Sequence, residues 1–302
     1  MLELQNALTD IGILDCNTKI LYENKGRNTY LLSGNLPWNC SNAVLKIVDV
    51  KFANEIMFYK EPLLSGYRPE VYFVDKYNRF VVMEYVRICD RWNDKTLEQA
   101  IQFMAEMHSV YWNNATTLPE WIPVIASVSE EQWRDFCRIV DNYLPDELRS
   151  YANLLKDGAK KVKTLFDSVL QSPLTLIHND FMYVNMGFGK SGLVLFDWSE
   201  LMLAPAAYEI CYPIFQFEEV FCCQVNKEML IDCYLSNLQR HGIVIDKVKF
   251  KNDCIISYLH KCLFSYIQHY LLNNTRKPLE RKVPVVCDMI KKLIRGVERD
   301  DD

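Results

Sequence analysis

Short runs of apolar and β-branched residues dominate the first third of the chain and predict strands. The clearest run, Ala43 to Val48, is apolar except for Lys46 in its middle, a composition typical of a strand. Similar runs predict further strands at residues 18–22, 28–32, 71–74 and 80–85. Residues 52–59 repeat apolar positions at helical spacing, so this segment is predicted to be a helix.

The remainder of the chain shows mostly helical periodicity. Residues 97–112 carry apolar side chains every three or four positions and predict an amphipathic helix. Further helices are predicted at residues 157–170, 218–240, 247–272 and 284–297. One short apolar run, Leu193 to Phe196, predicts a strand inside this helical region. The chain is therefore predicted to be rich in strands first and mainly helical afterwards.

Composition and charge narrow the class of protein. The chain has 302 residues, of which 50% are hydrophobic, and a formal net charge of −5. We therefore expect a globular protein that does not bind nucleic acid, because nucleic-acid binding requires a basic surface. The apolar run at residues 201–225 is interrupted by prolines and glutamates, and the N-terminus lacks the features of a secretory signal. These features favour a cytoplasmic protein that does not enter a membrane, with its eleven cysteines free.

The segment around Asp180 carries the strongest chemical signal in the chain. Asn185 follows Asp180 by five positions, and Asp197 stands at the end of the short apolar strand. This set of residues is used in phosphoryl transfer. Asp180 would orient the attacking hydroxyl and accept its proton, while Asn185 and Asp197 would hold magnesium ions, which prefer oxygen ligands. His178 is expected to brace the loop, and the alternative is an ordinary turn, since Asn and Asp favour turns.

Lys46 is unusual because a lysine inside an otherwise buried strand needs a counter-charge. Glu55, in the predicted helix, can supply it, and Lys46 would then grip the α- and β-phosphates of a nucleotide. Glu61, at the end of the same helix, is the competing partner. The alternative is that Lys46 points to solvent from an edge strand and that Glu55 lies on a solvated helix face.

The Asp180 motif, completed by Asp197-Trp198, resembles the aminoglycoside phosphotransferase and choline kinase family, and looks most like its ecdysteroid-kinase-like (CHK-like) members. The resemblance extends from about Thr18 to the C-terminal helices. It implies an α+β, bilobal protein-kinase-like fold, in which a small antiparallel-sheet N-lobe with one helix is followed by a mainly helical C-lobe. We expect a nucleotide-binding lobe at residues 1–86, and a lobe with the catalytic loop and the acceptor pocket at residues 87–302.

The resemblance also implies how the first lobe binds a nucleotide. Gly26 and Asn28 lie in a segment similar to the family's phosphate loop, although the full GxGxxG pattern is absent. The backbone amides of such a hairpin can donate to phosphate oxygens. In the family's hinge, Met83 would lie behind the base, the Glu84 carbonyl would accept from the exocyclic amine, and the Val86 amide would donate. This backbone recognition leaves the choice between ATP and GTP open.

Two features favour a small-molecule acceptor over a peptide. Asn, not Arg, precedes Asp180, so the chain lacks the residue that pairs with a phosphorylated activation loop in protein kinases. Helical sequence resumes within about ten residues of Asp197, which leaves too little chain for laying out a peptide. The expected acceptor is an alcohol on an amino sugar (aminoglycoside), a choline-like or a sterol-like molecule. A cationic acceptor could be bound by Glu200, Glu218 and Glu219, and the alternative is that these glutamates are surface charges.

The sequence therefore predicts an ATP-dependent kinase, with GTP as the alternative nucleotide and Mg²⁺ as cofactor, that phosphorylates a hydroxyl group. The protein is expected to act as a monomer or a homodimer. One alternative is a degenerate kinase-fold protein that binds its ligand without phosphotransfer, which the irregular glycine loop favours. The other is a kinase-like enzyme that transfers AMP. The intact set of charged residues argues against the degenerate protein, because a scaffold has no use for such a cluster.

Overall fold

The computed structural model of the protein describes residues 2–13, 15–24, 26–88, 92–221 and 225–300. The chain divides into two compact units, of which the first contains residues 1–123 and 176–203. The second unit contains residues 124–175 and 204–302. The predicted lobes, with a boundary at residue 86, stay a prediction. The compact first unit also includes the Asp180 loop, and the strand that follows this loop (Met186–Gly189) pairs with Arg87–Ile88 of the same unit.

The first unit is built around a five-stranded antiparallel sheet with the strand order β1-β2-β3-β5-β4. Its strands are β1 (Asn17–Asn24), β2 (Arg27–Ser33), β3 (Asn42–Val48), β4 (Val71–Val74) and β5 (Phe80–Glu84). The predicted strands are therefore confirmed, with small shifts at their ends. Lys46 lies in the central strand β3, opposite Thr29 of β2 and Val81 of β5.

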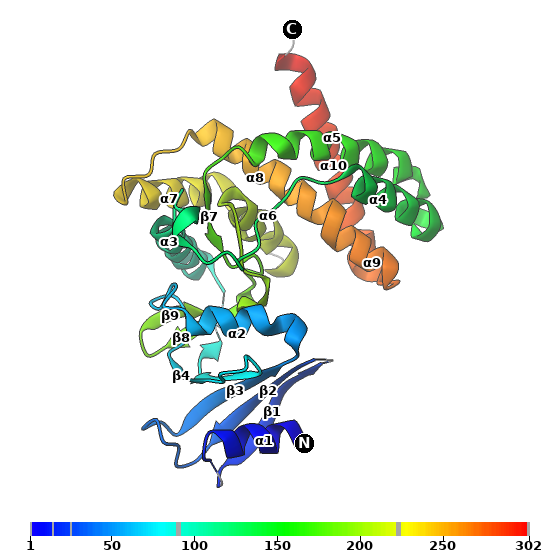
Figure 1. Ribbon diagram of the computed structural model, residues 1–302. Coiled ribbons are helices and arrows are strands. Elements are labelled where there is room, and N and C mark those ends of the chain that lie inside the picture. The colour runs from blue at the N-terminus through cyan, green and yellow to red at the C-terminus, as the bar shows by residue number, and fades with distance from the viewer. Residues whose placement is uncertain (1, 14, 25, 89–91, 222–224, 301–302) are drawn as a thin grey trace. The chain divides into compact units, whose positions relative to one another are not determined.

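One helix covers each face of this sheet (Figure 1). Helix α1 (Leu2–Asp10), which the sequence analysis did not predict, packs on an apolar face of the sheet. The buried cluster on this face includes Ala7, Leu8, Tyr30, Leu32, Leu45, Ile47, Phe80 and Val82. Helix α2 (Ala53–Lys60) lies on the opposite face, where Glu55 reaches Lys46. The predicted helix and its position beside Lys46 are thus confirmed.

The rest of the first unit positions the Asp180 loop. A three-stranded sheet with the order β6-β8-β9 follows the large sheet. Its strands are β6 (Arg87–Ile88), β8 (Met186–Gly189) and β9 (Gly192–Leu195). The short strands β7 (Leu174–Ile177) and β10 (Met202–Pro205) pair where the chain passes between the two units. Helix α3 (Asp94–Val110) begins with a capping box, in which Asn93 and Thr96 satisfy each other's backbone amides.

The second unit is helical. It contains α4 (Glu130–Tyr143), α5 (Ala152–Val169), α6 (Ala207–Phe221), α7 (Lys227–Arg240), α8 (Lys247–Lys261), α9 (Gln268–Leu272) and α10 (Arg276–Asp300). Helix α8 packs against both α5 and α6 and continues into α9 through a π-helical stretch, Cys262–Ile267. At the centre of this packing the ring of Phe166 stacks on His260 with 3.9 Å between centroids. The antiparallel sheet and the helical second part confirm the α+β, protein-kinase-like prediction.

Two predicted helix boundaries in the second unit are wrong. The helix expected at residues 218–240 is two helices, and the first of them, α6, already begins at Ala207, ten positions after Asp197. The last helix does not start at Pro284, because Pro284 lies inside α10. A proline inside a helix costs about 3 kcal/mol, and here Val283, Val286 and Ile290 around it are fully buried. Tertiary packing therefore outweighs the local preference.

Two expectations about the chain as a whole can be compared with the structure. Each cysteine in the described residues is free, namely Cys16, Cys40, Cys137, Cys211, Cys233, Cys254, Cys262 and Cys287. Among the described helices, none combines the length and the apolar character needed to cross a membrane.

Candidate active site

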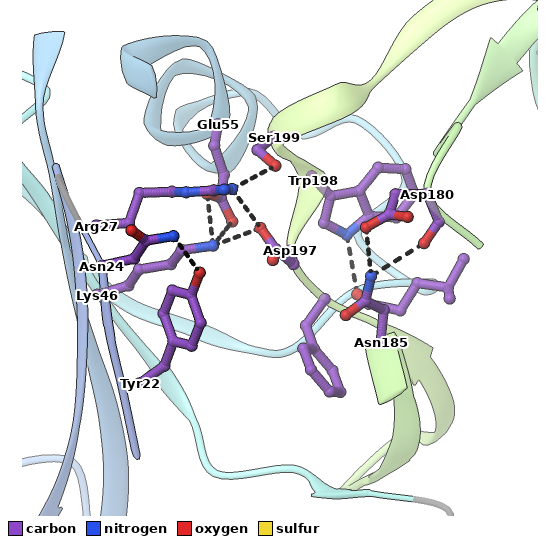
Figure 2. Close-up of polar contacts among 12 residues, drawn as sticks. Tyr22, Asn24, Arg27, Lys46, Glu55, Asp180, Asn185, Asp197, Trp198 and Ser199 are labelled. Carbon is purple, nitrogen blue, oxygen red and sulfur yellow. Dashed lines mark hydrogen bonds and ion pairs between the residues drawn. The ribbon is translucent and has the colours of Figure 1, made fainter. Parts of the chain in front are cut away.

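Lys46 lies at the centre of a buried charge cluster in the first unit (Figure 2). Its Nζ donates to Glu55 Oε1 over 2.8 Å and to Asp197 Oδ1 over 2.6 Å. Glu55 is fully buried and Lys46 is 7% exposed. The cluster joins three separate parts of the chain, since β3 contributes Lys46, α2 contributes Glu55, and Asp197 follows β9. Glu55, and not its competitor Glu61, is therefore the partner of Lys46.

Burial and charge act in opposite directions in this cluster. Burial alone would lower the pKa of Lys46, but the Glu55 and Asp197 carboxylates outweigh it and raise that pKa. Burial raises the pKa of Glu55, and Lys46 offsets part of this effect. For Asp197 burial also opposes ionisation, but the neighbouring ammonium of Lys46 dominates and lowers the pKa. Lys46 is thus held as a cation that faces the carboxylate of Asp197.

Asp180 and Asn185 meet in the loop between β7 and β8. The Asn185 Nδ2 donates to the backbone oxygen of Asp180 over 3.0 Å and to its Oδ2 over 2.9 Å. Backbone bonds shape the loop, because Met182 N donates to Asp180 O and Asn185 N donates to Met182 O. Phe196 N in turn donates to Asn185 O over 3.0 Å, which ties the loop to the residue before Asp197. The predicted proximity of these side chains is present within the first unit.

His178 and Trp198 form a buried support under this loop. The His178 Nε2 lies 3.0 Å from the carbonyl oxygen of Phe196, which can only accept, so Nε2 carries the proton. Its ring lies edge-on to Trp198, with 4.6 Å between centroids. Trp198 donates through Nε1 to the backbone oxygen of Leu195 and stacks on Phe58 of α2. His178 therefore has the bracing position that the sequence predicted.

The backbone at Asp197 is left-handed, with φ of 64°. Asn179, next to Asp180, has the same conformation, with φ of 65°. Asp and Asn tolerate this region better than other residues with a side chain. Strained backbone of this kind is common where a side chain must be aimed at a ligand.

Gly26 and Asn28, the residues of the β1–β2 hairpin that were predicted to bind phosphate, do not both point toward Lys46. Gly26 has φ of +84° and its carbonyl accepts from Asp49 N over 2.8 Å. Glycine suits this position because a residue with a side chain is strained at such a φ, and its Cβ would also meet the Asp49 carboxylate. Asn28 pairs with Ile47, so its side chain lies on the α1 face, away from Lys46. There it lines a pocket of about 240 Å³.

Arg27, which the sequence analysis did not select, points toward the Lys46 cluster instead (Figure 2). Its Nη1 lies 3.2 Å from Ser199 Oγ and 3.9 Å from Asp197 Oδ1. Strand alternation explains the difference, because neighbouring residues of a strand point to opposite faces. The sequence does show an arginine directly after Gly26. The face of the sheet on which the arginine side chain lies, however, depends on how β2 pairs with β3.

The hinge residues predicted from the family resemblance lie at the end of β5. Met83 is buried and faces the same side of the sheet as Lys46, because it pairs with Val44. The side chain of Glu84 stabilises the local structure, because its carboxylate accepts hydrogen bonds from the backbone amides of Glu70 and Lys190. Val86 is buried directly before β6. The role of these residues in holding a base stays a prediction.

Of the three glutamates suggested for a cationic acceptor, only Glu200 has a side chain that the structure describes. The backbone of Glu218 and Glu219 belongs to α6, but their side chains lie outside the described part of the chain. Glu200 is exposed and close to Asp180. Partial desolvation, and then the charge of Asp180, raise the pKa of Glu200. Its negative charge is therefore near the group expected to receive the acceptor proton.

The residues present suit a magnesium ion. The carboxylate of Asp197 is 33% exposed, and both bonds of the Asn185 side chain to Asp180 use its amide nitrogen, which leaves the amide oxygen for a ligand. Such hard oxygen donors are the kind that Mg²⁺ prefers, and in kinases phosphate and water supply the remaining ligands. In the described residues, no group of three or more His, Cys, Asp and Glu side chains is arranged to hold a metal.

A kinase-like sheet with a Lys–Glu–Asp cluster beside an Asp–Asn loop defines a phosphotransferase of the protein-kinase-like fold. The sequence matches the phosphotransferase enzyme family over residues 61–225, more than half of the chain, and the chain belongs to this family. This match confirms the predicted phosphotransferase family and the prediction that the protein is a phosphotransferase. The likeness to ecdysteroid-kinase-like members and the alcohol group as acceptor stay predictions. A search of curated proteins found no match.

Solved structures share this fold along nearly the whole chain. Choline kinase from Cryptosporidium parvum Iowa II has a TM-score of 0.67 and 13% identity, and covers 93% of this chain and 90% of its own. Choline kinase LicA from Streptococcus pneumoniae has a TM-score of 0.63 and 12% identity, with 97% and 100% covered. The gentamicin-APH(2")-IIa complex has a TM-score of 0.62 and 15% identity, with 95% and 97% covered. At these identities the likeness shows the fold.

Proposed function

We propose that the protein is an ATP-dependent, magnesium-requiring kinase that transfers the γ-phosphoryl group to a hydroxyl of a small molecule. The observation that carries this proposal is the pairing of Lys46 with both Glu55 and Asp197, beside the bonded pair Asp180–Asn185. A Lys–Glu ion pair and a metal-binding Asp in contact with it are the arrangement that kinases need for phosphoryl transfer. Structures of the same fold include an ADP-bound aminoglycoside phosphotransferase and a GDP complex of another, which supports a nucleotide as donor.

In this proposal each residue has a separate task. Lys46 binds the α- and β-phosphates, and Glu55 holds the ammonium in place. Asp180 accepts a hydrogen bond from the acceptor hydroxyl, orients it, and takes its proton as the new bond to phosphorus forms. Asn185 and Asp197 would hold Mg²⁺, which neutralises charge on the phosphates when it is bound. The rate enhancement then comes mainly from positioning and from electrostatic stabilisation.

The acceptor is proposed to be a small cationic alcohol, such as an amino sugar or a choline-like molecule. Glu200 supports this part, because its carboxylate lies near Asp180 and is open to solvent. Proteins of the same fold include choline kinases, an ethanolamine kinase and a gentamicin complex, whose named small molecules all carry amino or ammonium groups. A neutral sterol-like alcohol is the alternative that would make no use of Glu200.

The test is to incubate the protein with ATP, magnesium and a pooled library of amino sugars, choline analogues and sterols. Mass spectrometry should detect a phosphorylated product from a cationic acceptor. Asp180→Asn should lower turnover by about 10²–10⁴-fold, the usual contribution of a general base, while nucleotide binding survives. Asp167→Asn, an exposed aspartate on α5, is the matched control and should keep full activity.

Each alternative gives a different result in this experiment. A product heavier by AMP would identify an AMP transferase, and a phosphorylated sterol would exclude the role of Glu200. If no acceptor in the library is phosphorylated and calorimetry detects no binding of magnesium-ATP, the result favours the degenerate binding protein. An Asp180→Asn variant with wild-type turnover would remove the catalytic assignment.

A further inference from the structure

Arg27 occupies a position in the candidate active site that none of the proposed roles uses. It is the first residue of β2, pairs with Val48, and therefore lies on the same face of the sheet as Lys46. Figure 2 shows its guanidinium beside the Lys46 ammonium, with both groups directed toward Asp197. The Nη1 contacts Ser199 Oγ at 3.2 Å and lies 3.9 Å from Asp197 Oδ1.

The guanidinium of Arg27 is held in place but has hydrogen-bonding capacity left. Its Cζ lies 4.4 Å from the centre of the Phe52 ring, so the aromatic face supports the planar group. Its Nε is buried and has no hydrogen-bond partner among the described residues. A buried N–H without a partner is costly, and a guanidinium presents five donors in a fork that matches phosphate oxygens. The observation points to an oxyanion ligand.

The charges around Arg27 also leave room for an anion. Lys46 is already committed to two carboxylates, Glu55 and Asp197. With Arg27 included, this four-residue cluster has two positive and two negative charges. A nucleoside triphosphate adds several negative charges, and a second fixed cation beside Lys46 would neutralise part of them, in addition to Mg²⁺, as the terminal phosphoryl group is transferred.

The turn that precedes Arg27 is fixed to the rest of the unit. Gly26 accepts a hydrogen bond from Asp49 N, and the Asp49 side chain packs against its Cα. This hairpin has one glycine where a GxGxxG loop has three, so fewer backbone amides can approach the phosphates closely. A side-chain donor at the next position would compensate for that loss.

We infer that Arg27 is a further catalytic residue that binds the γ-phosphate oxygens of the nucleotide and that Ser199 positions its guanidinium. The inference rests on the proposed kinase function. During transfer the acceptor oxygen forms its bond to phosphorus, the bond from phosphorus to the ADP oxygen breaks, and the hydroxyl proton goes to Asp180. Arg27 keeps its protons and neutralises charge on the transferred group, as arginine does in other phosphotransfer enzymes.

The experiment compares binding of ADP with binding of a non-hydrolysable ATP analogue, each with magnesium, by calorimetry. Arg27→Gln should weaken the ATP analogue by about 10- to 100-fold, the range expected for hydrogen bonds to a charged group, and should change ADP affinity by less than about twofold. Arg27→Lys should recover part of the loss, because it restores the charge without the fork. Lys51→Gln is the matched control, because Lys51 also lies over the Phe52 ring but is exposed.

The outcomes separate this inference from the proposed function. Equal weakening of ADP and the ATP analogue by Arg27→Gln would overturn the γ-phosphate assignment, and so would unchanged binding of both. A wild-type protein that binds neither nucleotide overturns the inference and the proposed function together. If wild type binds both nucleotides but its product is heavier by AMP and not by phosphate, the proposed function fails, while the Arg27 comparison still tests whether this residue binds the γ-phosphate. Thermal unfolding of each variant confirms that it is folded.

Discussion

The two faces of the five-stranded sheet are made from alternate residues of the same strands, yet their characters are opposite. On the α1 face, Leu32, Leu45 and Val82 are fully buried against apolar neighbours. On the other face, Arg27 comes from the same strand as Leu32, Lys46 comes from the same strand as Leu45, and both side chains meet carboxylates. A single residue step along a strand therefore changes a side chain from a hydrophobic cluster to an ionic site.

This difference shows that one face of the sheet stabilises the fold, while the other face carries the groups for catalysis. Burial of apolar side chains stabilises the fold by about 1.5–3 kcal/mol for each large residue. A buried ion pair such as Lys46–Glu55 contributes much less, because desolvation of both charges offsets their attraction. The α1 face therefore stabilises the sheet, while the charged groups on the Lys46 face serve to bind a charged ligand.

The largest expected effect is on the charged face. Lys46→Met should lower kcat/KM by about 10²–10³-fold, comparable to removing one preorganised donor from a transition state. The matched double variant Lys46→Met with Glu55→Gln should be as inactive as Lys46→Met alone but more stable, because it leaves no unpaired charge at the fully buried Glu55 position. Steady-state kinetics and chemical denaturation measure both quantities. A double variant that unfolds far more easily would show that the ion pair is mainly structural.

The second-largest expected effect is a loss of stability when a side chain on the apolar face is shortened. Leu45→Ala, one position before Lys46, should reduce the free energy of unfolding by about 2–5 kcal/mol, because it leaves a cavity at a fully buried site. At a temperature where the variant is folded, its KM for ATP should stay near the wild-type value. A large rise in KM would mean that the two faces are not independent.

The smallest effect is the pH dependence of stability at Asp197. Its pKa is lowered in the folded protein, chiefly because the Lys46 charge overcomes burial. The ionised carboxylate therefore adds stability above the unfolded pKa of about 3.9, and this contribution is lost as the pH falls through the folded value. Wild type should exceed Asp197→Asn in stability by up to about 1 kcal/mol at pH 7, given the partial exposure of the group, and the difference should shrink as the pH falls below the unfolded pKa and through the folded one. A difference that grows in acid would contradict the direction of the shift.

Local sequence was sufficient for much of the fold. The strand from Ala43 to Val48 and the helix with Glu55 were predictable, because hydrophobic periodicity and β-branched residues act over a few positions. The loop with Asp180 and Asn185 was also found, since its spacing is set by a short connection between strands. Helix boundaries were less predictable. The last helix was predicted to start at Pro284, but packing around α10 outweighs the local helix-breaking preference of this proline.

The sequence by itself determined the family, the Asp180 loop and the identity of the charged residues, because these depend on residue types at short spacing. Only the tertiary structure decided which of them meet. Lys46 bonds to Asp197 across 151 positions of sequence, and Arg27, not Asn28, faces that pair because β2 pairs with β3 in one register. A shift of that register by one residue would reverse the faces, and local sequence does not specify the partner against which a strand is aligned.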